Sequence, residues 1–247
     1  MFKKIAVFIA VVATSASLYA EWIPRDCLLD LEPEVFNALD NSNFQSLKAK
    51  VSNALNGSWC TKEKLNLLMD LTYLIKPKVC VEIGAFTGST VLPVATTLQM
   101  LNHGKIYAID AWSNKEATMY LEDNDPNKSW WSSVSMKDIK STYDRMVQSW
   151  KLKPVCITLY VPSQEAIKHV PEIDFLHLDG NYSEIGALKD VQLYLPKVKS
   201  GGYILLSNLF TMVNGKQPKL KSFCALFEAC ELVCEIENDN AILFRKL

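Results

Sequence analysis

The sequence is short of several things, and each shortage excludes a class of protein. Only 9 of its 247 residues are glycine and 21% are charged, whereas 49% are hydrophobic, which excludes a disordered chain. Its 26 basic and 27 acidic residues leave a net charge of −1, so it lacks the basic excess typical of nucleic-acid-binding proteins. The length suits one sizeable α/β domain or two small ones. We therefore expect a folded protein with no nucleic-acid partner.

The first twenty residues differ from the rest. Two lysines precede the apolar run 5–13, and small residues follow up to Ala20. This is the order of regions in a secretory signal peptide, and the run is shorter than the roughly 20 residues that span a bilayer. We expect residues 1–20 to be a signal peptide, cut after Ala20 or Ser17, and the protein to be periplasmic or secreted, with no membrane contact after cleavage. A retained N-terminal membrane anchor and a cytoplasmic protein with an ordinary first helix are the alternatives.

All seven cysteines lie beyond that segment, and no pair has the spacing of a metal-binding finger. Cys80 and Cys156 fall in apolar strand patterns, where a free cysteine is usually a small core residue. Export would permit disulfides, and Cys27 and Cys60 are the best candidate pair.

Patterns typical of strands and helices alternate along the chain. Residues 21–60 carry short helical patches and predict an N-terminal helical extension. Strand patterns then follow at 79–83, 105–110, 155–161, 173–178, 203–206, 231–237 and 241–246. A helical pattern or a longer insert separates each of the first six from the next, and 238–240 is a hairpin signal. We predict an α/β domain over 61–247, doubly wound, with a mostly parallel seven-stranded sheet and a C-terminal antiparallel hairpin.

The segment 111–150 is polar and aromatic. It holds four of the six tryptophans: Trp112, Trp130, Trp131 and Trp150. Because a structureless loop of this length is unusual, we expect helices at about 115–121 and 136–150, with a mobile, exposed run between Glu122 and Trp131. The segment would form a lid and an acceptor pocket with aromatic walls. An additional buried layer or an oligomer interface is the alternative.

Two glycines mark a candidate ligand site. Gly84 and Gly88 follow the first strand pattern and open a helix, and Asp110 ends the next strand, 22 residues beyond Gly88. Ligands of doubly wound sheets bind at the carboxyl ends of strands, where Asp110 could accept hydrogen bonds from two ribose hydroxyls. The spacing is not the G-x-G-x-x-G fingerprint of pyrophosphate binding, and Glu82 directly before the glycines would repel a phosphate. A positively charged nucleoside cofactor such as S-adenosylmethionine (SAM) fits better than NAD or FAD.

From about residue 61 to 246 the chain resembles class I SAM-dependent methyltransferases. It is similar to the group that contains caffeoyl-CoA O-methyltransferase-like and cephalosporin-hydroxylase-like proteins, and the resembling stretches are 68–90, 105–112, 174–190 and 195–208. The resemblance implies a Rossmann-like fold, SAM as cofactor, a small-molecule acceptor methylated at oxygen, and a homodimer. It also implies cofactor-binding roles for Glu82, Gly84, Ala85, Gly88, Thr90, Asp110, Trp112, Ser163 and Asp179.

The resemblance implies further that Asp179 faces the transfer centre as general base, with Tyr182 orienting the acceptor. Metal-dependent members hold a divalent cation on an Asp after the fourth strand and an Asp-Asn pair after the fifth. Here that pair reads Ser207-Asn208, so Asp179 and Asn208 are the remaining candidate ligands and a metal is doubtful. Hydroxylase-like relatives carry a histidine where this chain has Tyr182.

Three functions stay open. The first is an active SAM-dependent methyltransferase of a small molecule. The second is an exported protein with the same fold that binds or acts as an effector without transfer activity, since SAM is made in the cytosol. The third is a related hydroxylase-like, metal-dependent enzyme. His177 lies within the fourth strand pattern, where we expect a buried, hydrogen-bonded residue rather than a base.

Overall fold

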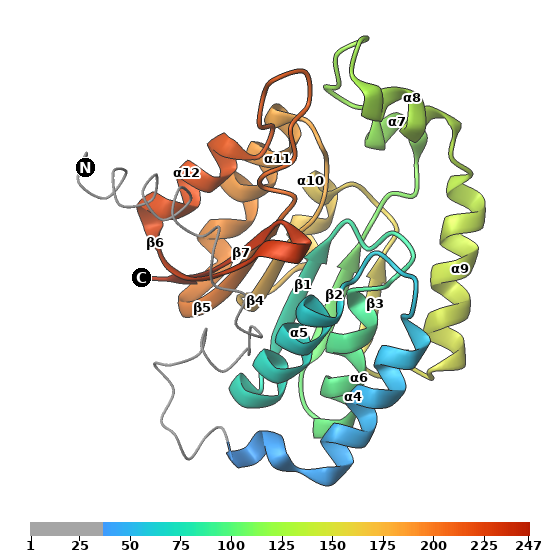
Figure 1. Ribbon diagram of the computed structural model, residues 1–247, viewed down its shortest axis with the longest axis vertical. Helices are drawn as coiled ribbons and strands as arrows, with labels where there is room; N and C mark the ends of the chain where they lie inside the picture. The colour runs from blue at the N-terminus through green and yellow to red at the C-terminus, as the bar shows by residue number, and fades with distance from the viewer. Residues whose placement is uncertain (1–36) are drawn as a thin grey trace.

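The computed structural model describes residues 37–247, which form a sheet with helices on both sides (Figure 1). The predicted signal peptide, the first part of the predicted extension and Cys27 lie outside the described residues. Export and the Cys27–Cys60 pair therefore stay predictions. Within 37–247, no helix has the length and apolar character needed to cross a membrane.

Across residues 37–247 the sheet has seven strands in the order β3-β2-β1-β4-β5-β7-β6. They are β1 (Val79–Ile83), β2 (Lys105–Ile109), β3 (Cys156–Leu159), β4 (Ile173–Leu178), β5 (Val198–Ser207), β6 (Cys230–Ile236) and β7 (Ala241–Lys246). The first five pair in parallel, and β7 runs antiparallel between β5 and β6. This confirms the predicted sheet. The order reverses between β1 and β4, at the kind of switch point where doubly wound sheets bind ligands.

Alternating side chains place a core on each face of the sheet. In β1, Cys80 belongs to one apolar cluster, and Val81 and Ile83 belong to the other. The helices that pack on the first cluster are α4 (Ser42–Ala54), α5 (Lys62–Ile75), α6 (Val91–Leu101) and α9 (Met136–Ser149). Those on the second are α10 (Ser163–Ala166), α11 (Glu184–Tyr194) and α12 (Leu220–Ala229). Because α4 shares the first core, the described part of the predicted extension packs as part of the same body.

Capping residues define both ends of α5. The Thr61 hydroxyl accepts a hydrogen bond from the Lys64 N–H at 3.3 Å and caps the first turn. The helix ends at Ile75, and its C-cap Lys76 has a left-handed φ of 45° directly before Pro77.

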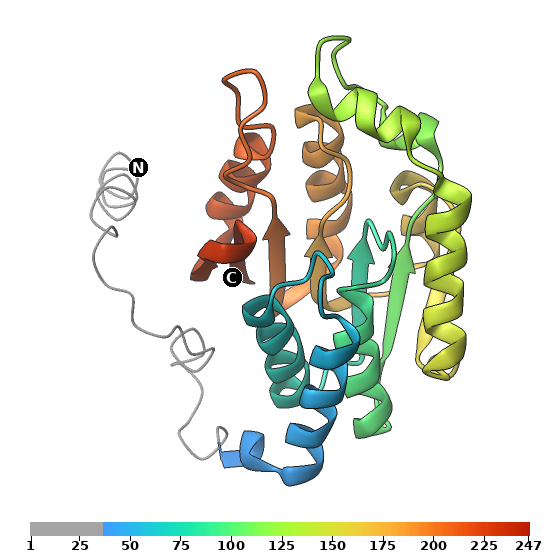
Figure 2. The ribbon, with the colours of Figure 1, turned by 45° about the vertical axis from the view of Figure 1, so that its right-hand side comes forward.

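The segment 111–150 forms three helices rather than the two predicted: α7 (Asn114–Ala117), α8 (Pro126–Ser133) and α9. The run between Glu122 and Trp131 is mostly exposed, as predicted, and its second half forms the start of α8. Asp125 caps α8 by accepting a hydrogen bond from the Asn127 N–H at 2.8 Å. Pro126 suits the first helical position, where its N–H would have no helical partner. The helices α7 and α8 lie beyond the carboxyl ends of the strands (Figure 2).

Strand β5 begins at Val198, before the predicted residue 203. Gly201 and Gly202, which precede the predicted strand, therefore lie within the observed one. Gly201 has a φ of 77° and the β4–β5 register is irregular in this part of the pair, so the glycine bends the strand. After β6, the short turn η4 (Glu237–Asp239) leads into β7 and brings Asp239 to Thr61, whose hydroxyl donates a hydrogen bond to it.

Candidate active site

A pocket lies at the carboxyl ends of the parallel strands, between the loops that follow β1, β2, β3 and β4. The segment containing α7 and α8, the start of α11 and Lys64 of α5 complete its wall. The predicted site residues that line it are Gly84, Ala85, Thr90, Asp110, Ser163, Asp179 and Tyr182. Those outside its lining are Glu82, Gly88, Trp112 and Asn208.

Gly84 joins the loops that follow β1 and β4. Its φ is 89°, and its N–H donates a hydrogen bond to the Ile109 carbonyl at 2.9 Å. A Cβ built on Gly84 would lie 2.3 Å from the carbonyl oxygen of Asp179. Only glycine combines that backbone conformation with so close an approach, so this position sets the spacing of the two loops.

Asp110 ties the loops after β1 and β2 together. Its carboxylate accepts hydrogen bonds from the backbone N–H groups of Phe86 at 2.9 Å and Trp112 at 2.7 Å. Those two residues have φ angles of 47° and 43°, which are uncommon for bulky side chains, and Asp110 holds both. Burial raises the pKa of Asp110, and the two N–H donors oppose that rise. Each oxygen keeps a further lone pair with which to accept a ligand hydroxyl.

Gly88 and Trp112 lie behind the pocket and contact α9. A Cβ on Gly88 would lie 2.1 Å from the Met146 Cε atom and 3.1 Å from the Tyr143 ring. The Trp112 indole packs 4.9 Å from the Tyr143 ring and 5.3 Å from the Tyr160 ring, measured between centroids. Both residues therefore hold α9 against the site loops, and their direct contact with a cofactor stays a prediction.

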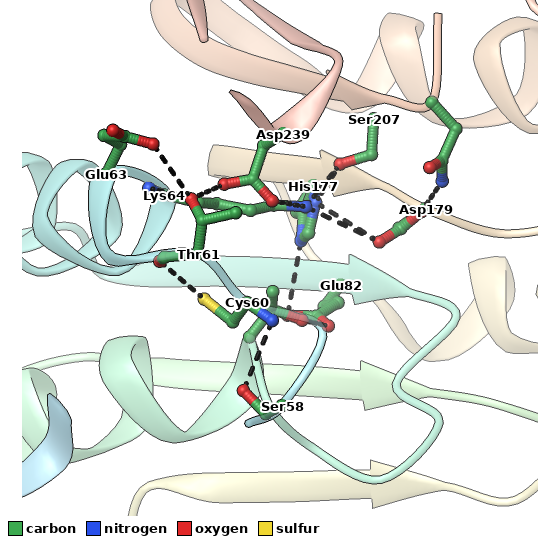
Figure 3. Close-up of polar contacts among 12 residues, drawn as sticks. Ser58, Cys60, Thr61, Glu63, Lys64, Glu82, His177, Asp179, Ser207 and Asp239 are labelled. Carbon is green, nitrogen blue, oxygen red and sulfur yellow. Dashed lines mark hydrogen bonds and ion pairs between the residues drawn. The ribbon is translucent and has the colours of Figure 1, made fainter. Parts of the chain in front are cut away.

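A buried polar cluster lies next to the pocket (Figure 3). His177 is 1% exposed, and its Nε2 lies 2.9 Å from the Ser207 hydroxyl. Its Nδ1 makes no hydrogen bond within 37–247 but faces the Glu82 carboxyl at 3.4 Å. Burial lowers the pKa of His177 to about 3 and raises that of Glu82 to about 8, while the Thr90 hydroxyl donates a hydrogen bond to Glu82. Both groups are therefore neutral at pH 7, and His177 is the buried residue predicted.

Lys64 belongs to this cluster, and sequence reasoning missed it. It is 4% exposed, and its Nζ donates a hydrogen bond to the Ser207 hydroxyl at 2.8 Å. The same nitrogen lies 3.8 Å from an Asp179 oxygen and 4.0 Å from an Asp239 oxygen. A signal was present: positions 64, 67, 68 and 71 form one helical stripe, and three of them are leucine. A lysine on such a stripe is buried and needs partners.

Asp179 is the carboxylate that this cluster presents to the pocket. One of its oxygens accepts a hydrogen bond from the Asn208 amide at 2.5 Å, and its side chain is 23% exposed. Asn208 follows β5 with a φ of 62°, which turns its amide toward Asp179. Burial and the nearby Asp179 raise the pKa of Tyr182, so its phenol stays protonated and can donate a hydrogen bond. Asp179 is thus placed to accept a proton from a bound molecule.

Aromatic side chains gather on the side of the pocket where Asp179 lies. We call Trp59, Phe86, Trp130, Trp131 and Tyr182 the aromatic cluster. The Trp59 and Phe86 rings stack with centroids 5.0 Å apart and an interplanar angle of 9°. Trp131 links Phe86 at 5.8 Å to Tyr182 at 5.8 Å. Trp59, which was not predicted, is 62% exposed, so the cluster has an open face.

A further buried carboxyl, that of Asp190, lines the pocket beside Gly180 in the loop after β4. Ser163, predicted to bind cofactor, donates a hydrogen bond to Asp190 at 2.5 Å, and both residues line the pocket. Burial raises the pKa of Asp190 to about 6, although the Ser163 hydroxyl opposes that rise. Asp190 comes from the interior of α11, where nothing in the sequence set it apart.

This strand order, with a pocket at its switch point, defines the Rossmann-like methyltransferase class of fold. The sequence profile of the methyltransferase domain family matches residues 81–209, more than half of the chain, so this protein belongs to that family. The predicted family resemblance is confirmed. Comparison with curated proteins gives no match.

Solved structures share the fold at low identity. The O-methyltransferase TomG from Streptomyces achromogenes, in complex with SAM, has a TM-score of 0.56 at 12% identity, covering 83% of this chain and 90% of its own. The methyltransferase PaMTH1 from Podospora anserina, bound to S-adenosylhomocysteine, has a TM-score of 0.54 at 12% identity, covering 88% and 97%. An O-methyltransferase from Bacillus cereus, also solved with S-adenosylhomocysteine, has a TM-score of 0.53 at 11% identity, covering 86% and 97%.

Proposed function

We propose that the protein transfers the methyl group of SAM to a hydroxyl oxygen of a small, planar aromatic acceptor. One observation carries this proposal: a single pocket joins the nucleoside-type loops at Gly84 and Asp110 to an accessible carboxylate, Asp179, beside an aromatic cluster. Membership of the methyltransferase family and neighbours solved with SAM or S-adenosylhomocysteine support it.

The residues present suit SAM. Asp110 offers free lone pairs to the ribose hydroxyls, and the backbone at Gly84 and Ala85 allows a ligand close to the end of β1. The apolar side chains of Ile109 and Val161 line the pocket and would flank the adenine. Thr90 would contact the amino-acid end, and its hydrogen bond to the Glu82 carboxyl behind it would hold it there. Asp179 would lie between cofactor and acceptor.

When bound, SAM supplies an electrophilic methyl carbon on a positively charged sulfur. Asp179 accepts the proton of the acceptor hydroxyl as the oxygen bonds to that carbon and the carbon–sulfur bond breaks, which leaves S-adenosylhomocysteine. Tyr182 donates a hydrogen bond that orients the acceptor. The aromatic cluster stacks on the acceptor ring and excludes water, so alignment of the two reactants contributes a large share of the rate enhancement.

Calorimetric titration with SAM, followed by a turnover assay over phenols, catechols and aliphatic alcohols, tests the proposal. We expect the protein to bind SAM and to methylate phenols or catechols. Asp179→Asn should keep SAM affinity within about two-fold, while kcat falls by about 10²–10⁴-fold because the base is lost. Asp123→Asn, an exposed carboxyl change outside the pocket, is the matched control.

The outcomes separate this function from its alternatives. Absence of SAM binding, or full turnover by the Asp179→Asn variant, would contradict the proposal. SAM binding without turnover on any acceptor would favour a protein that binds without transferring.

We also infer export and a homodimer, which the leader pattern and the family resemblance support. Intact-mass measurement of the secreted and cell-bound protein tests cleavage near Ala20. Light scattering tests the homodimer, and a monomer at assay concentration would contradict it.

A further inference from the structure

The groups between the ends of β4 and β5 are poorly suited to a divalent metal ion. Hard cations take several oxygen ligands, with carboxylates the strongest among them. Here Asp179 is the one carboxylate at the two strand ends, beside the neutral Ser207 hydroxyl and the Asn208 amide. Within 37–247, no group of three or more His, Cys, Asp or Glu side chains could hold a metal ion. Asn208 also turns its N–H₂ donor toward Asp179, as it would toward a negative charge.

The Lys64 ammonium already lies among these oxygens (Figure 3). It donates to the Ser207 hydroxyl at 2.8 Å and lies 3.8 Å from the Asp179 oxygen that Asn208 leaves free. A divalent ion on Ser207 at about 2.2 Å would be at most about 5 Å from the ammonium nitrogen, and the two positive charges would repel. With His177 neutral through burial, Lys64 is the positive charge closest to Asp179 in this cluster.

We propose that the Lys64 ammonium occupies the place of a divalent cation between Asp179 and Ser207, so that this protein binds no metal there and works without one. The catalytic part of this inference rests on the proposed function. Lys64 acts as a positioning residue: it orients the Asp179 carboxylate, and it supplies positive charge where the acceptor oxygen becomes negative. Thr61 and Asp239 hold α5 and the β6–β7 turn together, which fixes the position of Lys64.

The first experiment titrates the full chain with Mn²⁺ and follows the free ion by electron paramagnetic resonance. We expect no binding by the wild-type protein at 25 °C up to about 1 mM Mn²⁺, the range of weak protein sites. Addition of EDTA should leave the rate of S-adenosylhomocysteine release unchanged. Stoichiometric Mn²⁺ binding that Asp179→Asn abolishes, or EDTA inactivation reversed by Mn²⁺, would overturn the proposal.

The second experiment converts the site. The double variant Lys64→Met/Ser207→Asp removes the ammonium and adds a carboxylate, so it should bind Mn²⁺ at least about ten-fold more tightly than wild type. A loss of structure could not produce that gain. The matched control is Lys48→Met/Ser207→Asp, because Lys48 forms a part-buried ion pair with Asp70 at 2.8 Å outside the pocket. Equal Mn²⁺ affinity in the two double variants would contradict a specific role for Lys64.

The third experiment addresses catalysis. Lys64→Met should lower kcat by about 10²-fold, because stabilisation of the transition-state charge is lost, while SAM affinity changes little. Unchanged kcat would contradict the catalytic part. If this variant fails to fold, the wild-type Mn²⁺ titration and the EDTA assay still show whether the protein binds a metal ion and needs one. Failure of the proposed function appears separately, as absence of SAM binding by the wild-type protein.

Discussion

At one end of the pocket the central carboxylate, Asp110, accepts hydrogen bonds from backbone groups, whereas at the other end the carboxylate of Asp179 contacts side chains. The cofactor end, at the loops after β1 and β2, depends on Asp110 and two backbone N–H groups, and on the backbone of Gly84. The acceptor end, at the loops after β4 and β5, depends on Asp179, Asn208 and Lys64. The geometry of the cofactor end therefore depends mainly on backbone groups, which most substitutions leave in place. The chemistry of the acceptor end depends on side chains, so single substitutions can change it.

The largest effect is expected where the two ends touch. Gly84→Ala forces a Cβ against the Asp179 carbonyl at a φ of 89°, so it should destabilise the fold by more than about 4 kcal/mol, measured by urea denaturation. Gly57→Ala is the matched control, because Gly57 has a φ of 76° but no atom within 4 Å of the added Cβ. The Gly57→Ala variant should lose about 1–2 kcal/mol of folding stability. Similar losses in the two variants would mean that the ends are not held by this contact.

A pH-dependent change is expected at Asp190. Its pKa in the fold, about 6, lies above the ordinary value of 3.8, so its contribution to stability is present below pH 3.8 and is lost as the pH rises through 6. Asp190→Asn removes that loss. From pH 4 to pH 7, the free energy of unfolding of the variant relative to wild type should rise by up to about 3 kcal/mol. Parallel curves for the two proteins would show that Asp190 titrates normally.

Each end of the pocket is expected to set the affinity for one ligand, SAM at the cofactor end and the acceptor at the other. Asp110→Asn keeps an acceptor oxygen but turns an N–H₂ donor toward a backbone N–H, so SAM affinity should fall at least about ten-fold, or about 1.4 kcal/mol. Calorimetry measures this effect, and KM for the acceptor should stay within about two-fold. A larger change in acceptor KM than in SAM affinity would reverse the assignment of the ends.

The smallest effect is expected at Trp59. Its ring stacks on Phe86 yet is 62% exposed, so Trp59→Ala should leave folding stability nearly unchanged. The lost stacking, about 1 kcal/mol, should raise the KM for an aromatic acceptor about five-fold. An aliphatic alcohol that serves as acceptor should show no such rise, and a rise of equal size would mean that Trp59 does not stack on the substrate.

The two ends also differ in how far the sequence predicts them. Gly84 and Asp110 follow strand patterns at a spacing that the sheet itself imposes, so their neighbourhood could be predicted. The contact of Lys64 with Ser207 joins residues 143 positions apart and depends on the packing of α5 against β5. The lysine on an apolar stripe and the Asp125-Pro126 cap of α8 were legible signals. No local pattern fixes which carboxylate a buried lysine meets, because tertiary packing decides it.

The contact between Gly84 and the Asp179 carbonyl has a consequence for substrate change. Because two backbones touch there, the span between the cofactor end and the proton acceptor is set by the main chain of β1 and β4, and no mobile lid has to set it. Little conformational entropy remains to be lost at that span when ligands bind. New acceptors can then be accommodated by exchanging exposed rings such as Trp59, while the transfer distance stays constant.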